Sequence, residues 1–151
     1  MSAQRVLVML GTDMAWSRGI LRGFMAAAHE QTWTLLHYHP SADLHWLVNE
    51  WRPAAVVIGS GFDPGALAGL ARASLVSVTV DRSADGIASV CLDEEAIAAL
   101  ALEHLAATRL QAVATFRYDE SPFAVARERA FAEQARAVAR WWAWQIATAS
   151  A

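Results

Sequence analysis

Polar and charged residues follow the apolar, strand-length runs of this sequence. They are the pair Thr12 and Asp13, then Ser60, the pair Asp81 and Arg82, and finally Asp93. In parallel α/β sheets the carboxyl ends of the strands share one edge, and ligands usually bind there. Carboxylate and hydroxyl oxygens accept hydrogen bonds from hydroxyl groups, and a guanidinium donates them. The pattern therefore predicts a polar binding rim, with the alternative that each residue only caps a helix or forms a turn.

Trp16 follows closely on the first of these polar pairs. Its amphipathic indole ring could stack on a ring-shaped ligand at the same edge of the sheet. The alternative is that the ring anchors the start of a helix by packing on the fold. With the polar residues, Trp16 completes the predicted ligand-binding set.

Three histidines lie close together but do not form a familiar metal motif. His37 and His39 are two residues apart on a predicted strand, so they point to the same face, and His45 follows on a predicted helix. No cysteine or carboxylate cluster joins them at the spacing of known zinc sites. We expect histidines at a solvent-exposed edge and no bound metal.

Motifs for nucleotide binding and for nucleophilic catalysis are also missing. Gly59-Ser60-Gly61 is not followed by a third glycine or by Lys-Ser/Thr, and Ser60 does not lie in a nucleophile elbow. Cys91 falls inside a predicted strand, which favours an inert core thiol. The sequence therefore predicts no cofactor and no catalytic residue.

Composition limits the class of protein further. The 151 residues suit one domain, and 56% of them are hydrophobic, but no apolar run approaches the ~20 residues of a membrane span. The net charge of −3 argues against non-specific binding to nucleic acid. The single cysteine and the lack of a signal-peptide pattern predict a cytoplasmic protein.

Strand and helix patterns alternate along the chain. Strands are predicted at residues 5–10, 33–39, 54–58, 75–80, 88–92 and 110–116. Helices are predicted at residues 16–30, 44–51, 65–73, 94–107 and 123–141. Apolar strands that alternate with amphipathic helices predict a three-layer α/β/α, Rossmann-like (flavodoxin-like) fold with a mostly parallel sheet of about six strands.

The end of the sequence departs from this alternation. Residues 1–141 are predicted to form one domain, and residues 142–151 a tail. Trp141, Trp142 and Trp144 would cover more than one face of a helix. We expect this segment to be disordered or packed against a partner.

Five segments follow one another at a characteristic order and spacing: residues 15–23 (AWSRGILRG), 46–59 (WLVNEWRPAAVVIG), 75–81, 90–104 and 116–131. In these segments the stretch from Val6 to Phe131 resembles the N-terminal lobe of the periplasmic-binding-protein-like sensor of LacI-type repressors. The closest resemblance is to xylose operon regulators, which carry an AraC-type DNA-binding domain. Asp93-Glu94 stands where the family has Asp-Asn, and no helix-turn-helix pair is found.

The resemblance implies a fold of the periplasmic-binding-protein-like I lobe type and a role as half of a sugar sensor in a bacterial transcription regulator. The effector cleft would be lined by the predicted set: Thr12, Asp13, Trp16, Ser60, Asp81, Arg82 and Asp93. It also implies a homodimer that contacts DNA only through a domain absent from this chain, with no membrane partner. Such a protein is not an enzyme.

Two other functions stay open at this point. A small flavodoxin-like enzyme would need reactive carboxylates at the strand ends, for which Asp13, Asp81 and Asp93 are the candidates. A dimerisation module would use the apolar helix at residues 44–51 and the tryptophans near the end of the chain.

Overall fold

The computed structural model describes residues 3–59, 64–72, 75–81, 83–108, 112–117, 120–136 and 140–145. The chain divides into two compact units, Met1–Cys91 and Leu92–Ala151. We call them the first and the second unit and describe each by itself.

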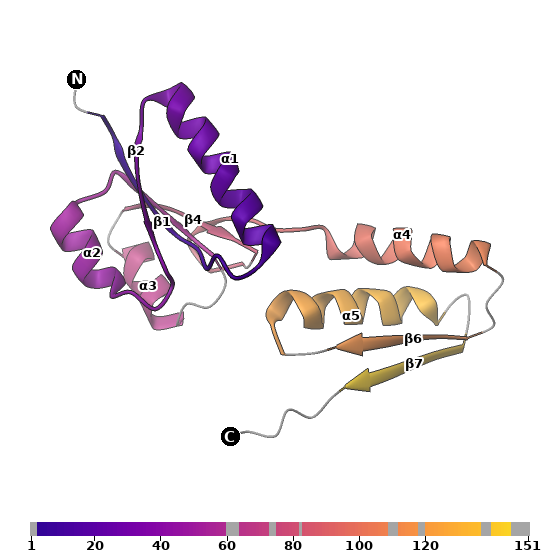
Figure 1. Cartoon of the computed structure of the whole chain (residues 1–151). Helices are drawn as coiled ribbons and strands as arrows, with labels where there is room; N and C mark the ends of the chain where they lie inside the picture. The colour runs from indigo at the N-terminus through magenta and orange to yellow at the C-terminus, as the bar shows by residue number, and fades with distance from the viewer. Residues whose placement is uncertain are drawn as a thin grey trace. The chain divides into compact units, whose positions relative to one another are not determined.

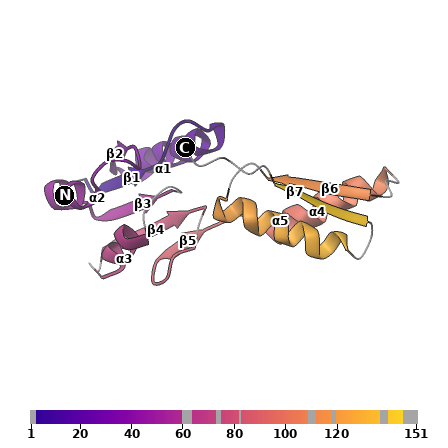
Figure 2. The same ribbon diagram turned by 90° about the horizontal axis from the view of Figure 1, so that it is seen from below.

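The first unit is a parallel sheet with helices on both faces (Figures 1 and 2). Its elements are β1 (Arg5–Met9), α1 (Ala15–Gln31), β2 (Thr34–Tyr38), α2 (Leu44–Trp51), β3 (Ala55–Ile58), α3 (Pro64–Arg72), β4 (Val76–Val80) and β5 (Ala88–Val90). The five strands lie in the order β2-β1-β3-β4-β5, and every neighbouring pair is parallel. The predicted α/β fold with a parallel sheet between helices is confirmed.

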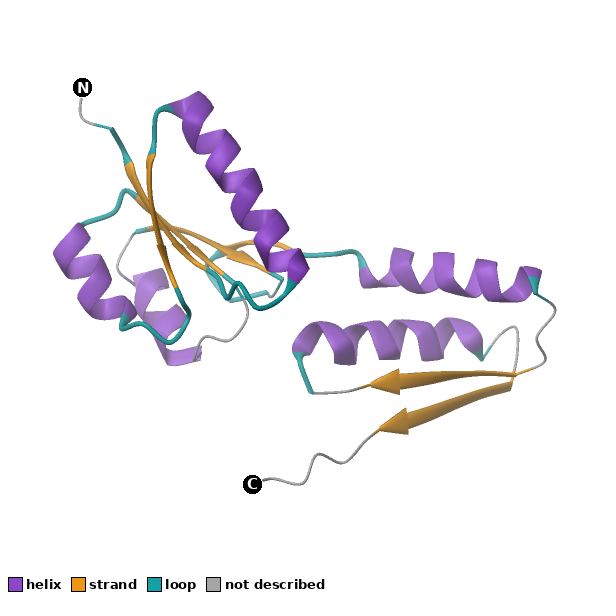
Figure 3. Cartoon of the chain, viewed as in Figure 1, coloured by secondary structure: helices purple, strands orange, loops and turns teal. Residues whose placement is uncertain are grey.

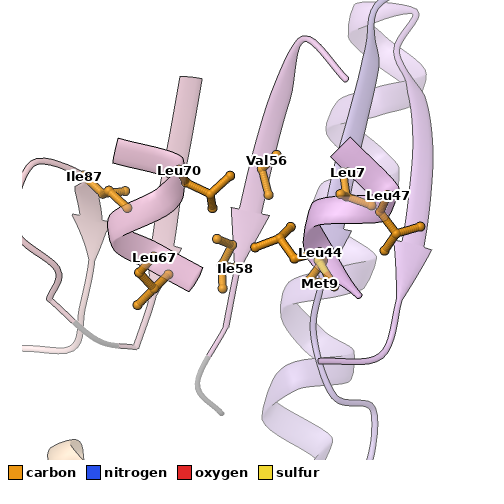
Figure 4. Packing of buried hydrophobic residues seen from close by; sticks show 9 residues of the cluster. All are labelled: Leu7, Met9, Leu44, Leu47, Val56, Ile58, Leu67, Leu70 and Ile87. Atoms are coloured by element: carbon orange, nitrogen blue, oxygen red, sulfur yellow. The ribbon is translucent and has the colours of Figure 1, made fainter. Parts of the chain in front are cut away.

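Alternating residues of the strands fill two separate cores. Val6 and Val8 of β1 pack with Val57 on the face that α1 covers with Ile20 and Phe24. Side chains of the opposite face meet α2 and α3 instead (Figure 4); they are Leu7, Met9, Val56 and Ile58, packed with Leu44, Leu47, Leu67 and Leu70. Because both faces are covered, the inner strands β1 and β3 are apolar on both sides, as the sequence predicted.

The edge strand β5 corrects one sequence-based expectation. All three of its residues are exposed, and Cys91, which follows it, is exposed as well. Cys91 is therefore not a core thiol. The reason is that β5 pairs with β4 on one side only, and the strand ends at Val90, one residue before the cysteine.

The second unit contains α4 (Glu94–Ala107), β6 (Ala112–Arg117), α5 (Pro122–Ala135) and β7 (Arg140–Gln145). β6 and β7 form a separate parallel pair, and α5 lies beside both α4 and this pair (Figure 3). Its core is formed by Ala98 and Leu102 of α4, Val113 of β6, and Ala130, Phe131 and Ala135 of α5. The sixth predicted strand thus pairs with β7, not with the five-stranded sheet.

The predictions for the end of the chain were partly wrong. The last helix ends at Ala135 and not at residue 141, and residues 142–145 belong to strand β7. The grouping of residues 142–151 as a tail stays a prediction. The segment RWWAWQ is rich in aromatic residues, which favour strands. The side chains of this strand and the residues after Gln145 lie outside the described part of the chain. The grouping of residues 1–141 as one domain stays a prediction.

Ion pairs connect the elements of the second unit. Arg127 of α5 donates two hydrogen bonds to Glu94 of α4, with N···O distances of 2.6 and 3.1 Å. Arg117 of β6 donates to Glu128 of α5 at 2.7 Å and also pairs with Glu120. Hydrogen bonds to Glu120 and Glu128 raise the pKa of Arg117 above its ordinary value.

None of the described helices is long and apolar enough to cross a membrane.

Candidate functional site

A cavity of about 370 Å³ opens at the carboxyl ends of β1, β2 and β3. Strand β1 lies between β2 and β3 in the sheet. The chain leaves β1 toward β2 and leaves β3 toward β4, so these two connections run in opposite directions along the sheet. This is the switch point of an open α/β sheet, where two loops diverge and leave a crevice. The side chains suited to bind a ligand there are Asp13, Trp16, Ser17, His39 and Ser41.

Asp13 and Trp16 are the two residues of the predicted set that line this cavity. Trp16 is the second residue of α1 and keeps 37% of its surface exposed. The N-cap of α1 is Met14, and no side chain makes a capping hydrogen bond there. The carboxylate of Asp13 is therefore not used as a helix cap, and the capping alternative does not hold for this residue.

Arg18 stabilises the loop that carries Asp13. Its Nη1 atom donates to the main-chain oxygens of Thr12 and Asp13 at 2.7 and 2.9 Å. Thr12 is exposed but does not line the cavity. The guanidinium group thus holds the main chain of the loop, while the Asp13 side chain is left to the cavity.

His39 and Ser41 line the cavity but were not in the predicted set. Both follow β2 directly, so the rule applied to the other strand ends would have found them. The backbone N–H of Ser41 donates to Nδ1 of His39 at 3.2 Å, and the Ser41 hydroxyl lies 2.9 Å from the same atom. Because Nδ1 accepts a hydrogen bond, the neutral ring carries its proton on Nε2. His39 is exposed, as expected for an edge histidine, and in this form it is a donor.

Two glycines shape the wall of the cavity. A Cβ atom built on Gly11 would lie 3.8 Å from Oδ2 of Asp13 and 4.0 Å from Nε2 of His39. Gly11 thus leaves open the space next to both polar atoms. A Cβ atom on Gly59 would clash with Cδ2 of Leu10, a side chain that is only 2% exposed. Any larger residue at position 59 would displace this buried leucine.

Two other predicted residues have structural roles of their own. Asp81 directly follows β4 in a left-handed conformation (φ 67°), and its N–H donates to the main-chain oxygen of Val90 at 2.9 Å. Asp93, in the second unit, accepts from the N–H of Ala96 at 2.9 Å and so caps α4. Ser60 and Arg82 lie outside the described residues. Of the aspartates required by the enzyme alternative, Asp13 lines the cavity, and Asp81 of the same unit is not among the residues that line it.

A metal site is not formed by the described part of the chain. No group of three or more His, Cys, Asp or Glu side chains lies close enough there to hold an ion. His37 takes another role, since its Nε2 lies 2.9 Å from the main-chain oxygen of Leu10.

The sequence matches no protein-family model and no curated protein. The structure matches several solved regulators. The Cra transcriptional dual regulator of Pseudomonas putida, in complex with fructose 1-phosphate, is 17% identical with a TM-score of 0.77 and covers 94% of this chain. A periplasmic binding protein/LacI transcriptional regulator of Alkaliphilus metalliredigens, complexed with D-xylulofuranose, is 14% identical with a TM-score of 0.78 and covers 99%. A LacI transcriptional regulator of a Rhodococcus species is 19% identical with a TM-score of 0.79 and covers 94%.

These matches define the fold as that of a periplasmic-binding-protein-like I lobe. The chain spans 57% to 59% of the length of these three proteins. Each of the three is a transcription regulator, and two were solved with a sugar or a sugar phosphate. At such low identities the likeness concerns the fold, and the activities belong to those proteins.

Proposed function

We propose that this chain is the sugar-sensing part of a cytoplasmic bacterial transcription regulator and has no catalytic activity of its own. The observation that supports the proposal is the cavity at the switch point of the sheet, with Trp16 and Asp13 in its wall. We propose further that the regulator is of the xylose type with an AraC-type DNA-binding domain, the group that the sequence resembles. In this proposal a separate domain contacts the DNA.

The chemistry of the cavity suits a monosaccharide. A half-exposed indole offers an apolar face to a sugar ring, and the surrounding hydroxyl, imidazole and carboxylate groups match its hydroxyls. The volume of about 370 Å³ is near the lower end of the range of small-molecule sites. The other predicted contacts, Thr12, Ser60, Asp81, Arg82 and Asp93, stay predictions from the sequence.

A second lobe completes the sensor in this proposal. Closure of two lobes around an effector would change the geometry of an attached DNA-binding domain. The present chain supplies one wall of the site, so its own affinity for a sugar should be in the millimolar range, because about half of the contacts are missing.

Titration of the labelled chain with sugars tests the proposal. We expect millimolar pentose or hexose to shift the indole N–H resonance of Trp16 and the amide resonances of Gly11 and Ser41 in NMR spectra. Trp16→Ala should weaken binding about tenfold, since an aromatic stacking contact contributes roughly 0.5–1.5 kcal/mol beyond the buried area. Trp46→Ala is the matched control, because Trp46 is 55% exposed and does not line the cavity. If no sugar in a panel of pentoses and hexoses shifts these resonances, the proposal is wrong.

We also propose that the chain forms a homodimer through α2. Trp46 presents a large apolar surface on this helix, and aromatic residues are enriched in protein interfaces. Sedimentation velocity at high micromolar concentration should therefore show a dimer, and Trp46→Ser should shift it to a monomer. A wild-type chain that sediments as a monomer would contradict this part of the proposal.

A further inference from the structure

We infer that the cavity selects an uncharged monosaccharide over the phosphate ester of the same sugar. This inference rests on the proposed sugar-sensing function and adds the charge class of the ligand. The supporting observation is that two polar atoms, Oδ2 of Asp13 and Nε2 of His39, lie next to the open space beside Gly11.

The carboxylate of Asp13 is available to a ligand. No described residue donates a hydrogen bond to it or pairs with its charge, and the side chain is exposed at the cavity wall. An ionised carboxylate only accepts hydrogen bonds, so it needs donors such as sugar hydroxyls. A phosphate group would instead place a second negative charge close to the first, and like charges a few ångströms apart repel.

His39 supplies the complementary donor. Its Nδ1 is occupied by the Ser41 N–H, which leaves the proton on Nε2 in the neutral ring. Nε2 of His39 and Oδ2 of Asp13 both lie within 4.0 Å of the position of a Cβ atom on Gly11. A hydroxyl group can donate and accept at once, so neighbouring hydroxyls of one sugar ring satisfy both atoms. A phosphate satisfies only the donor.

The positive groups near the cavity do not reverse this preference. No Lys or Arg is among the described residues that line it. Arg18 directs Nη1 to the main-chain oxygens of Thr12 and Asp13. The N-terminus of α1 contributes the equivalent of about half a positive charge, which is less than the full negative charge of Asp13.

Paired NMR titrations of the full chain at constant ionic strength test the inference. The probes are D-fructose against fructose 1-phosphate and D-glucose against glucose 1-phosphate. The wild-type chain should bind each free sugar about tenfold more tightly than its ester. Asp13→Asn removes the charge and keeps the shape, so this ratio should fall to about one, mostly through tighter binding of the esters. Asp85→Asn removes the same charge from an exposed residue that does not line the cavity and should keep the wild-type ratio.

The outcomes separate this inference from the function on which it rests. Tighter binding of the esters than of the free sugars by the wild-type chain would overturn the charge preference and leave sugar sensing intact. An unchanged ratio in Asp13→Asn would overturn the assignment to Asp13. Failure of both ligand classes to bind would overturn the proposed function itself.

Discussion

Ile58→Ala should lower the free energy of unfolding of the first unit by about 3–4 kcal/mol. Ile58 is fully buried at the end of β3, the central strand of the sheet. It belongs to the cluster that joins the sheet to α2 and α3 (Figure 4). Truncation removes apolar contacts and leaves a cavity, because covered strands cannot collapse onto the vacated space.

Amide hydrogen exchange can measure this effect within one unit of the chain. The slowest amides of β1 and β3 should exchange at least about a hundredfold faster in Ile58→Ala, since 1.4 kcal/mol corresponds to a factor of ten. Val76→Ala on the neighbouring strand is the control, because Val76 is 65% exposed and should change exchange only slightly. Equal effects of the two substitutions would contradict the assignment of Ile58 to the core.

The same strand shows why the fold could be predicted. Ala54 to Ile58 is a short apolar run that ends at a glycine, which is typical of a strand buried on both faces. The five strands of the first unit and their helices were found at nearly their observed bounds from such runs. Asp43 directly precedes the predicted helix at residues 44–51 and caps it, since its carboxylate accepts a hydrogen bond from the N–H of Trp46 at 3.0 Å.

The C-terminal end of α5 could not be predicted from the sequence pattern. Alanine residues continue past Ala135 in the sequence, and alanine favours a helix. Alanine content therefore does not mark the residue at which α5 ends. The pairing of β7 with β6 supplies the hydrogen bonds that stabilise a strand there. Such pairing is a tertiary effect, and it overrides local propensity.

The candidate site was predicted in part for a similar reason. Asp13 and Trp16 follow the first strand, and the rule for strand ends located them. The order β2-β1-β3 decides which connections meet at one cavity, and this order is not visible in the sequence. The strand-end rule, applied to β2 as well, would have added His39 and Ser41, whereas Asp93 proved to be a helix cap in the second unit.

Phe131→Ala should destabilise the second unit by about 3–5 kcal/mol. Phe131 of α5 is only 8% exposed and is the largest side chain in the core formed with Ala98, Leu102 and Val113. A unit of this size buries little apolar surface, so the loss of one phenyl ring removes a large share of its stability.

Phe116 offers a matched control for this prediction, because it is the same residue type in the same unit but is 63% exposed on β6. Phe116→Ala should change the exchange of the α4 and α5 amides less than about tenfold, whereas Phe131→Ala should accelerate it by about a hundredfold or more. The ion pairs of Arg127 with Glu94 and of Arg117 with Glu128 remain in both variants. A larger effect from Phe116 than from Phe131 would mean that the second unit is stabilised through the exposed side of β6 and not through the core between its two helices.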